Sequence, residues 1–139
     1  MALLLVEDDT LIRLTLSDFF EAAGIECLEA SNAEEALAII DDPSHCIDVL
    51  VTDLNLGTGD NGLALAIKAR LRWPRLQVIY ETGSPELLVG RAFSPREQVF
   101  FKPFDPVALA AAVSALNGSI RSEGRHQRPT TPATLASSL

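Results

Sequence analysis

Charged and hydroxyl side chains stand at the ends of four short, mainly apolar stretches of the chain. These side chains are Glu7, Asp8, Asp53, Thr82 and Lys102. Carboxylates at close range repel one another unless a cation neutralises them, and oxygen ligands of this kind suit Mg²⁺. A metal beside a free carboxylate and a lysine suits phosphoryl transfer, which needs positioning and neutralisation of charge on the transferring oxygens. An aspartate can be the covalent acceptor in that chemistry.

Each of these residues also has a purely structural interpretation. Acids such as Glu7 and Asp8 suit the start of a helix, and Asp53 suits a turn. Thr82 could simply begin a loop, and Lys102 suits a surface position before a proline. Asp9 is best explained as a helix N-cap. Because the residues follow separate strands of one expected sheet, their combination favours a shared site over four unrelated explanations.

Strand-like and helical patterns alternate five times along the chain. We expect strands at Ala2–Val6, Ile25–Ala30, Ile47–Thr52, Leu76–Tyr80 and Gln98–Phe101. We expect helices at Asp9–Ala23, from Ser31 to Ile40, at Leu63–Arg72, at Pro85–Arg91 and from Pro106 to Asn117. This order predicts a parallel sheet covered by helices on both faces, with right-handed crossovers. Ligands of such sheets bind outside the carboxyl ends of the strands.

Helix-capping patterns and a change of composition set the expected boundaries. Ser31 and Glu34 have capping-box spacing, and Asp105 with Pro106 suits a helix start. We expect Asn117-Gly118 to end the last helix. Residues 118–139 are rich in Ser, Thr, Pro and Gly. We therefore expect a folded domain over residues 1–117 and a disordered tail over 118–139.

The overall composition limits the possible partners. The formal charge is −8, the sequence pI is about 4.6, and 47% of the residues are hydrophobic. This charge argues against non-specific binding to nucleic acid or to an anionic membrane. The apolar N-terminal stretch is too short for a signal peptide. Cys27 and Cys46 have no zinc-ligand spacing and suit a reduced, cytoplasmic protein.

Four motifs together resemble the receiver domain of two-component response regulators of the chemotaxis-regulator type. The motifs are "LLLVEDD", "DVLVTDLNLG", "VIYETG" and "FFKPF", which occur in family order and at family spacing. The resemblance implies a flavodoxin-like (βα)5 fold, a doubly wound parallel sheet of five strands in the order 2-1-3-4-5. It covers residues 2–117.

The resemblance assigns a role to each residue that matches a family motif. Asp53 matches the phosphoacceptor, with Thr82 as the switch hydroxyl and Lys102 as the lysine that pairs with the phosphoryl group. Glu7, Asp8 and Asp53, with the backbone carbonyl of Asn55, match the Mg²⁺ site, in which Mn²⁺ can substitute. Family members usually have a cis peptide bond at the position of Lys102-Pro103.

Three positions depart from the family pattern. Gly57 stands where the family usually has proline, and the loop that runs to Gly62 is about one residue longer. Glu81 replaces a small or apolar residue before the switch hydroxyl. Val99 replaces the switch aromatic residue, three positions before the lysine.

These expectations lead to one main hypothesis and three alternatives. The main hypothesis is a single-domain response regulator that accepts a phosphoryl group at Asp53 from a sensor histidine kinase or phosphotransfer protein and signals to a downstream protein. One alternative is a receiver-fold binding module that acts independently of phosphorylation, and another is a phosphorelay intermediate. The last is a turnover phosphatase with an aspartyl intermediate, which is disfavoured because such enzymes carry a second acid where this chain has Asn55.

Overall fold

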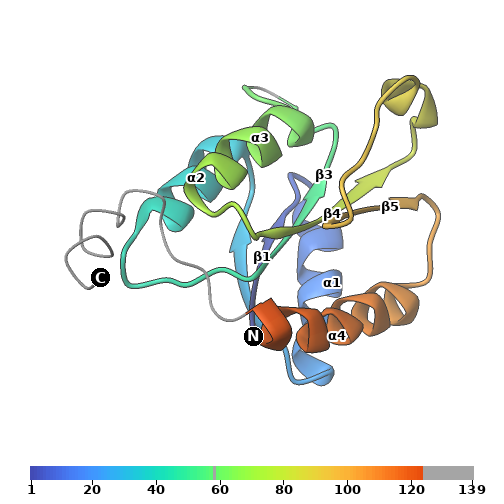
Figure 1. The fold of residues 1–139 in the computed structure, drawn as a ribbon. Coiled ribbons are helices and arrows are strands. Elements are labelled where there is room, and N and C mark those ends of the chain that lie inside the picture. The colour runs from blue at the N-terminus through green and yellow to red at the C-terminus, as the bar shows by residue number, and fades with distance from the viewer. Residues whose placement is uncertain (58, 124–139) are drawn as a thin grey trace.

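Helices cover both faces of a five-stranded parallel sheet in the computed structural model (Figure 1). The structure describes residues 1–57 and 59–123. The strands pair in the order β2-β1-β3-β4-β5, with bounds β1 Ala2–Val6, β2 Glu26–Ala30, β3 Val49–Asp53, β4 Gln77–Thr82 and β5 Glu97–Phe101. The helices are α1 Thr10–Ala22, α2 Ala33–Asp41, α3 Gly62–Arg72 and α4 Pro106–Glu123, with the 3-10 turn η1 at Pro85–Leu88. The expected sheet and strand order are confirmed.

Two apolar layers hold the helices against the sheet. Leu50 of β3 packs into the layer beneath α2 and α3, with Ile40 and Leu65. Val51, the next residue, points to the other face and packs beneath α1 and α4, with Phe20. Every residue of β1, β3 and β4 is buried, whereas the edge strands β2 and β5 are partly exposed. This double burial explains why the central strands are nearly continuous apolar runs.

The last helix is longer than expected. Its predicted end at Asn117-Gly118 is wrong, because α4 continues to Glu123. Ile120 is only 5% exposed and joins the layer beneath α1 and α4, at helical spacing from Val113. Burial of Ile120 offsets the low helix propensity of Gly118. Residues 118–123 of the expected tail are therefore helical, and residues 124–139 lie outside the described residues.

The start of α2 differs from its predicted form. Asn32 is the N-cap, and its side chain accepts a hydrogen bond from Glu35 N–H at 2.8 Å. Glu35 in turn accepts from Ser31 N–H at 2.9 Å. The expected Ser31 and Glu34 box is therefore shifted by one residue, because Asn32 is an equally good capping residue.

The fourth helix of the expected pattern is reduced to the single turn η1. Leu88 is buried in the layer beneath α2 and α3, whereas Val89 is 81% exposed. Gly90 has a φ of +79°, a left-handed conformation that ends the helical path. The predicted helix over Pro85–Arg91 is thus too long, since only Leu88 anchors this segment to the core.

Helix α1 buries only part of its apolar side chains. Leu16 and Phe20 are buried, but Ile12 and Phe19 are partly exposed and Ala23 lies just past the helix end. Ile12 instead lines the cleft at the carboxyl ends of the strands. Across the described residues, no helix combines the length and the apolar character needed to cross a membrane.

Candidate functional site

Asp53 ends the central strand β3, and its carboxylate holds the ammonium group of Lys102. Lys102 Nζ donates to Asp53 Oδ2 at 2.6 Å, and Asn55 N–H donates to Asp53 Oδ1 at 3.0 Å. Lys102 follows β5, and its main-chain N–H donates to Thr82 O at 2.8 Å. The peptide bond between Lys102 and Pro103 is cis, as predicted. Two strands that lie apart in the sheet therefore bring the acid and the lysine together.

Lys102 is the cation that faces the carboxylates of this cleft. Burial lowers the pKa of its ammonium group. The hydrogen bond and charge of Asp53, with the charges of Glu7 and Glu81, raise this pKa by more than burial lowers it, so the net shift is upward. Lys102 Nζ also lies 3.8 Å from Glu7 Oε1. Lys102 is therefore positively charged at neutral pH and shared between Asp53 and Glu7.

Three acids form a group suited to a hard cation. Glu7, Asp8 and Asp53 each offer a carboxylate oxygen within 4.8 Å of the others. Glu7 Oε2 accepts from Asp9 N–H at 3.1 Å, whereas the buried Glu7 Oε1 has no hydrogen-bond donor. Burial, together with the nearby charge of Asp53, raises the pKa of Glu7 to about 7. A divalent cation would relieve this charge and satisfy the free oxygen, so the residues fit Mg²⁺.

Asp9 does not belong to this group of acids. Its side chain accepts a hydrogen bond from Ile12 N–H at 3.0 Å and caps α1, as expected. The cap also turns the chain from β1 into the helix, so that Glu7 and Asp8 lie at the edge of the sheet.

Thr82 lies at the end of β4, across the same cleft. Its side chain is buried and its Oγ1 accepts a hydrogen bond from Ser84 N–H at 2.8 Å. The cleft is lined by Glu7, Asp8, Asp9, Ile12, Asp53, Asn55, Thr82, Gly83, Ser84 and Lys102. Except for Val99 and Pro103, all the predicted site residues therefore line one hollow.

Val99 lies outside this cleft lining. It pairs with Tyr80 in the register of β4 and β5 and packs against the apolar layer beneath α2 and α3. Tyr80 is buried, and its hydroxyl donates to Glu97 Oε2 at 2.6 Å. An aromatic ring therefore does occur beside the Val99 position, but it belongs to β4 and is tied to β5 by a hydrogen bond.

Glu81 is a buried acid whose environment the sequence did not reveal. It is fully buried, and neither carboxylate oxygen has a hydrogen-bond partner. Its position in β4 is directly opposite Asp53 of β3, so both point to the same face of the sheet. Burial, then the charge of Glu7, raises the pKa of Glu81 to about 8. The predicted strand ends at Tyr80, whereas β4 continues to Thr82, so the burial of Glu81 inside the sheet was not expected from the sequence.

The glycine-rich loop after Asp53 explains the missing family proline. Gly57 has a φ of +75°, which proline cannot adopt. A side chain at Gly57 would begin 3.4 Å from Asp8 Oδ2, so this backbone runs close to the acid group. Gly62, at the start of α3, packs directly on the main chain of Asp53. The loop therefore approaches Asp8 and Asp53 through glycines at both of its ends.

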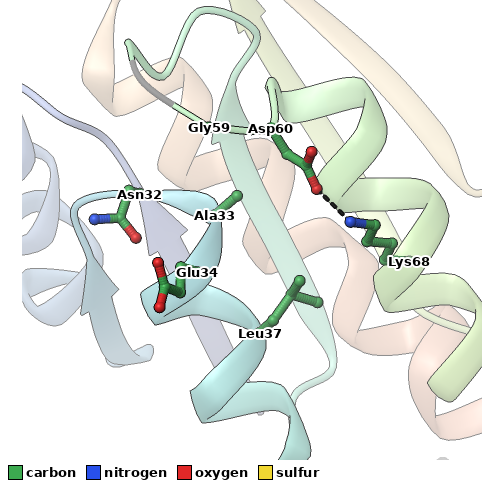
Figure 2. Close-up of a pocket in the computed structure, with 7 residues that line it drawn as sticks. All are labelled: Asn32, Ala33, Glu34, Leu37, Gly59, Asp60 and Lys68. Atoms are coloured by element: carbon green, nitrogen blue, oxygen red, sulfur yellow. Dashed lines mark hydrogen bonds and ion pairs between the residues drawn. The ribbon is translucent and has the colours of Figure 1, made fainter.

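A second hollow lies between α2 and α3, on another part of the surface. Figure 2 shows Asp60 and Lys68 facing each other, with Glu34 and Leu37 on the α2 side. Lys68 Nζ donates to Asp60 Oδ2 at 2.6 Å, so the lysine of this hollow is already engaged. None of the predicted site residues lines it.

Comparison with known proteins decides the family. The model of the response regulator receiver domain matches residues 3–114. The chain belongs to this family. Receiver domains are the phosphoacceptors of two-component systems; they generally bind Mg²⁺ at an acidic cluster and interact with histidine kinases and downstream effectors.

Sequence and structural relatives agree with this assignment. The DNA-binding transcriptional regulator NtrC of Salmonella typhimurium is 34% identical over 128 residues, which are 89% of this chain and 26% of NtrC. This receiver thus spans about a quarter of that relative. A CheY-like receiver domain from Methanospirillum hungatei is 26% identical with a TM-score of 0.72, covering 88% of this chain and 98% of the other. A receiver protein from Sinorhizobium medicae, also 26% identical, has a TM-score of 0.76 and covers 84% and 93%.

Proposed function

We propose that this receiver is a Mg²⁺-dependent switch that accepts a phosphoryl group at Asp53. The donor is the phosphohistidine of a sensor kinase or phosphotransfer protein. The observation that supports the proposal best is the 2.6 Å contact of Lys102 Nζ with Asp53 Oδ2 in a cleft that also holds Glu7 and Asp8. A carboxylate, a lysine and a group of acids suited to a metal are what phosphoryl transfer needs.

In the proposed step, a carboxylate oxygen of Asp53 attacks the phosphorus atom of the donor. The new O–P bond forms as the P–N bond breaks, and the electron pair of that bond stays on the histidine nitrogen. Lys102 would neutralise negative charge on the transferring oxygens, and the Thr82 hydroxyl and Asn55 N–H, which line the same cleft, are proposed to donate hydrogen bonds to them. Attack by water on the same phosphorus later releases phosphate and restores Asp53.

Glu7, Asp8 and Asp53, with the main-chain carbonyl of Asn55, would hold the metal. Mg²⁺, or Mn²⁺ in its place, would neutralise the acids and the phosphoryl oxygens. The free Glu7 Oε1 and the grouping of the three carboxylates support this assignment. Asp9 N–H keeps Glu7 oriented toward the group.

Phosphorylation is proposed to change a protein-binding surface through Thr82. A phosphoryl group brings about −1.5 to −2 of charge to Asp53, which attracts Lys102 and the Thr82 hydroxyl. Thr82 ends β4 three residues before η1 begins at Pro85, and Leu87 of η1 is 52% exposed. A shift of Thr82 therefore reaches an apolar surface on which a downstream protein can bind.

The donor is proposed to dock over an apolar groove next to the cleft. The groove runs between α1 and the start of α4, and its apolar lining includes Leu11, Ile12, Phe104 and Pro106. Ile12 and Lys102 line both the groove and the cleft. A helix of the donor seated in the groove would therefore hold its phosphohistidine beside Asp53.

The proposal is tested by incubating the protein with MgCl₂ and acetyl phosphate or a phosphorylated kinase. We expect the mass of one phosphoryl group on the wild type, lost on treatment with hydroxylamine, and none on Asp53→Asn. Asp18→Asn, the same change at an exposed position of α1, serves as the control. No mass gain on the wild type, or an equal gain on Asp53→Asn, contradicts the proposal.

A binding module that works without phosphorylation is a second candidate. It is favoured by one observation, the fully buried Glu81 opposite Asp53, because a phosphoryl group at Asp53 would add negative charge beside a carboxyl group that is held uncharged up to about pH 8. This candidate predicts that Asp53→Ala leaves partner capture unchanged, whereas the main proposal predicts that capture depends on phosphorylation. Pull-down with acetyl phosphate present and absent separates the two.

A further inference from the structure

Arg13 of α1 reaches back to the end of β1, beside the candidate metal ligands. Its Nη1 donates to the main-chain oxygen of Glu7 at 2.8 Å. That oxygen belongs to the peptide that joins Glu7 to Asp8. Arg13 is also the only lysine or arginine among residues 1–67 of the sequence. The one arginine in this acidic half of the chain, which holds no lysine, is therefore bonded to the main chain of the acidic turn.

The edge strand β2 holds Arg13 in place. Glu29 Oε1 accepts from Arg13 Nε at 3.3 Å, and the side chains of Arg13 and Glu29 are only 16% and 32% exposed. The next residue of β2, Ala30, accepts from Glu7 N–H at 3.1 Å. The peptide group before Glu7 is thus fixed by the main chain of β2. The peptide group after Glu7 is fixed by the Arg13 side chain, which Glu29 of β2 orients.

We propose that Arg13 is a positioning residue for the metal site. It holds the plane of the Glu7–Asp8 peptide, so that the two carboxylates point at the position the cation takes beside Asp53. The inference rests on the proposed function, because it takes Glu7, Asp8 and Asp53 as the metal ligands. Groups that orient metal ligands commonly change metal affinity by about 10- to 100-fold when they are removed.

Charge alone predicts the opposite effect. Loss of a positive side chain near a cation site strengthens cation binding, because the repulsion between the two is removed. Loss of a positioning group weakens binding, because the ligands must be ordered by the metal itself. The sign of the change in Mg²⁺ affinity therefore distinguishes a positioning role from a simple electrostatic one.

The experiment measures Mg²⁺ affinity by isothermal titration calorimetry, with an EPR titration of Mn²⁺ as a second readout. We expect Arg13→Lys, which keeps the charge but cannot bond Glu7 O and Glu29 together, to bind Mg²⁺ about tenfold more weakly. Arg13→Gln should also bind more weakly, although it removes a positive charge. Glu29→Gln keeps Arg13 intact and should give a smaller weakening, which provides a test if the Arg13 variants fold poorly by circular dichroism.

Arg72→Lys is a matched control. Arg72 Nε pairs with Asp41, and its Nη1 donates to Lys68 O at 3.0 Å, the same two kinds of contact at a place outside the cleft. This variant should bind Mg²⁺ as the wild type does. Unchanged affinity in Arg13→Lys together with tighter binding in Arg13→Gln would overturn the inference while leaving the proposed function intact. A wild type that binds no Mg²⁺ would overturn both.

Discussion

Lys102 Nζ and Asp53 Oδ2 lie 2.6 Å apart, although Asp53 ends β3 and Lys102 follows β5, and β4 lies between these two strands. We expect Lys102→Met to slow phosphorylation of Asp53 by acetyl phosphate about 100-fold, because a preorganised donor to the transferring oxygens is lost. The rate is measured by intact mass against time at saturating MgCl₂.

Lys68→Met is the control for this change. Lys68 is ion-paired with Asp60 in the other hollow, so its loss should leave the phosphorylation rate unaltered. Lys102→Arg should recover part of the rate, since it restores the charge but not the shape of the ammonium group. A Lys102→Met rate equal to that of the wild type would show that Lys102 takes no part in the transfer.

The buried acids predict a stability that falls as the pH rises. Burial raises the pKa of Glu81 to about 8 and that of Glu7 to about 7 from an ordinary value of 4.5. Between about pH 4.5 and pH 8 the folded protein therefore binds more protons than the unfolded chain. The stability that comes from protonated Glu7 and Glu81 is complete below about pH 4.5 and is lost as the pH rises through 7 to 8. Urea unfolding of the metal-free protein across this range should show the decline.

Two changes should flatten this pH dependence. Glu81→Gln removes the larger of the two shifts, so the free energy of unfolding should fall less between pH 5 and pH 8. Saturating MgCl₂ should also flatten it, because the cation favours the charged form of Glu7. Glu86→Gln, at an exposed position of η1, should keep the wild-type slope. If the free energy of unfolding fell equally with pH in Glu81→Gln and in the wild type, Glu81 would not be the source of the pH dependence.

Gly62 is predicted to be required for the position of Asp53. A Cβ at residue 62 would overlap the Asp53 carbonyl oxygen and lie 3.0 Å from its carbon and 3.1 Å from Leu54 Cα. These are main-chain atoms that cannot move aside cheaply, so we expect Gly62→Ala to lower the free energy of unfolding by about 1–3 kcal/mol. Chemical denaturation measures this change.

Gly118→Ala makes the same substitution where a Cβ meets open space within α4. There we expect a gain of about 0.5–1 kcal/mol, because alanine favours a helix more than glycine does. Equal effects of the two substitutions would contradict the close packing of Gly62 on Asp53.

The extension of α4 predicts a stabilising role for Ile120. Because this side chain is 5% exposed, Ile120→Ala should lower the free energy of unfolding by about 2–4 kcal/mol. Val107→Ala, on the same helix but 58% exposed, should change it by about 0.5 kcal/mol or less. A negligible effect at Ile120 would mean that α4 ends before it in solution.

Local patterns determined most of the architecture from the sequence. The apolar runs of β1, β3 and β4, the cap at Asp9 and the repeated order of strands and helices depend on neighbouring residues, so they predict the parallel sheet directly. The rule that parallel strands meet at their carboxyl ends then places Glu7, Asp53, Thr82 and Lys102 together. The resemblance of the four motifs to receiver domains then predicted a role for each of these residues.

Tertiary structure decided what depends on distant parts of the chain. The sequence marks Glu81 as unusual, but only the packing of β4 between β3 and β5 shows that its carboxylate is buried without a hydrogen bond. Gly118 suits a helix end by its residue type, but the burial of Ile120 keeps α4 helical beyond it. In the sequence Arg13 is only a charged residue of a helix. The fold places Glu29 and the main-chain carbonyl of Glu7 within hydrogen-bond distance of its side chain. Burial and hydrogen bonding across strands are set by how the elements pack, and local residue patterns do not carry that information.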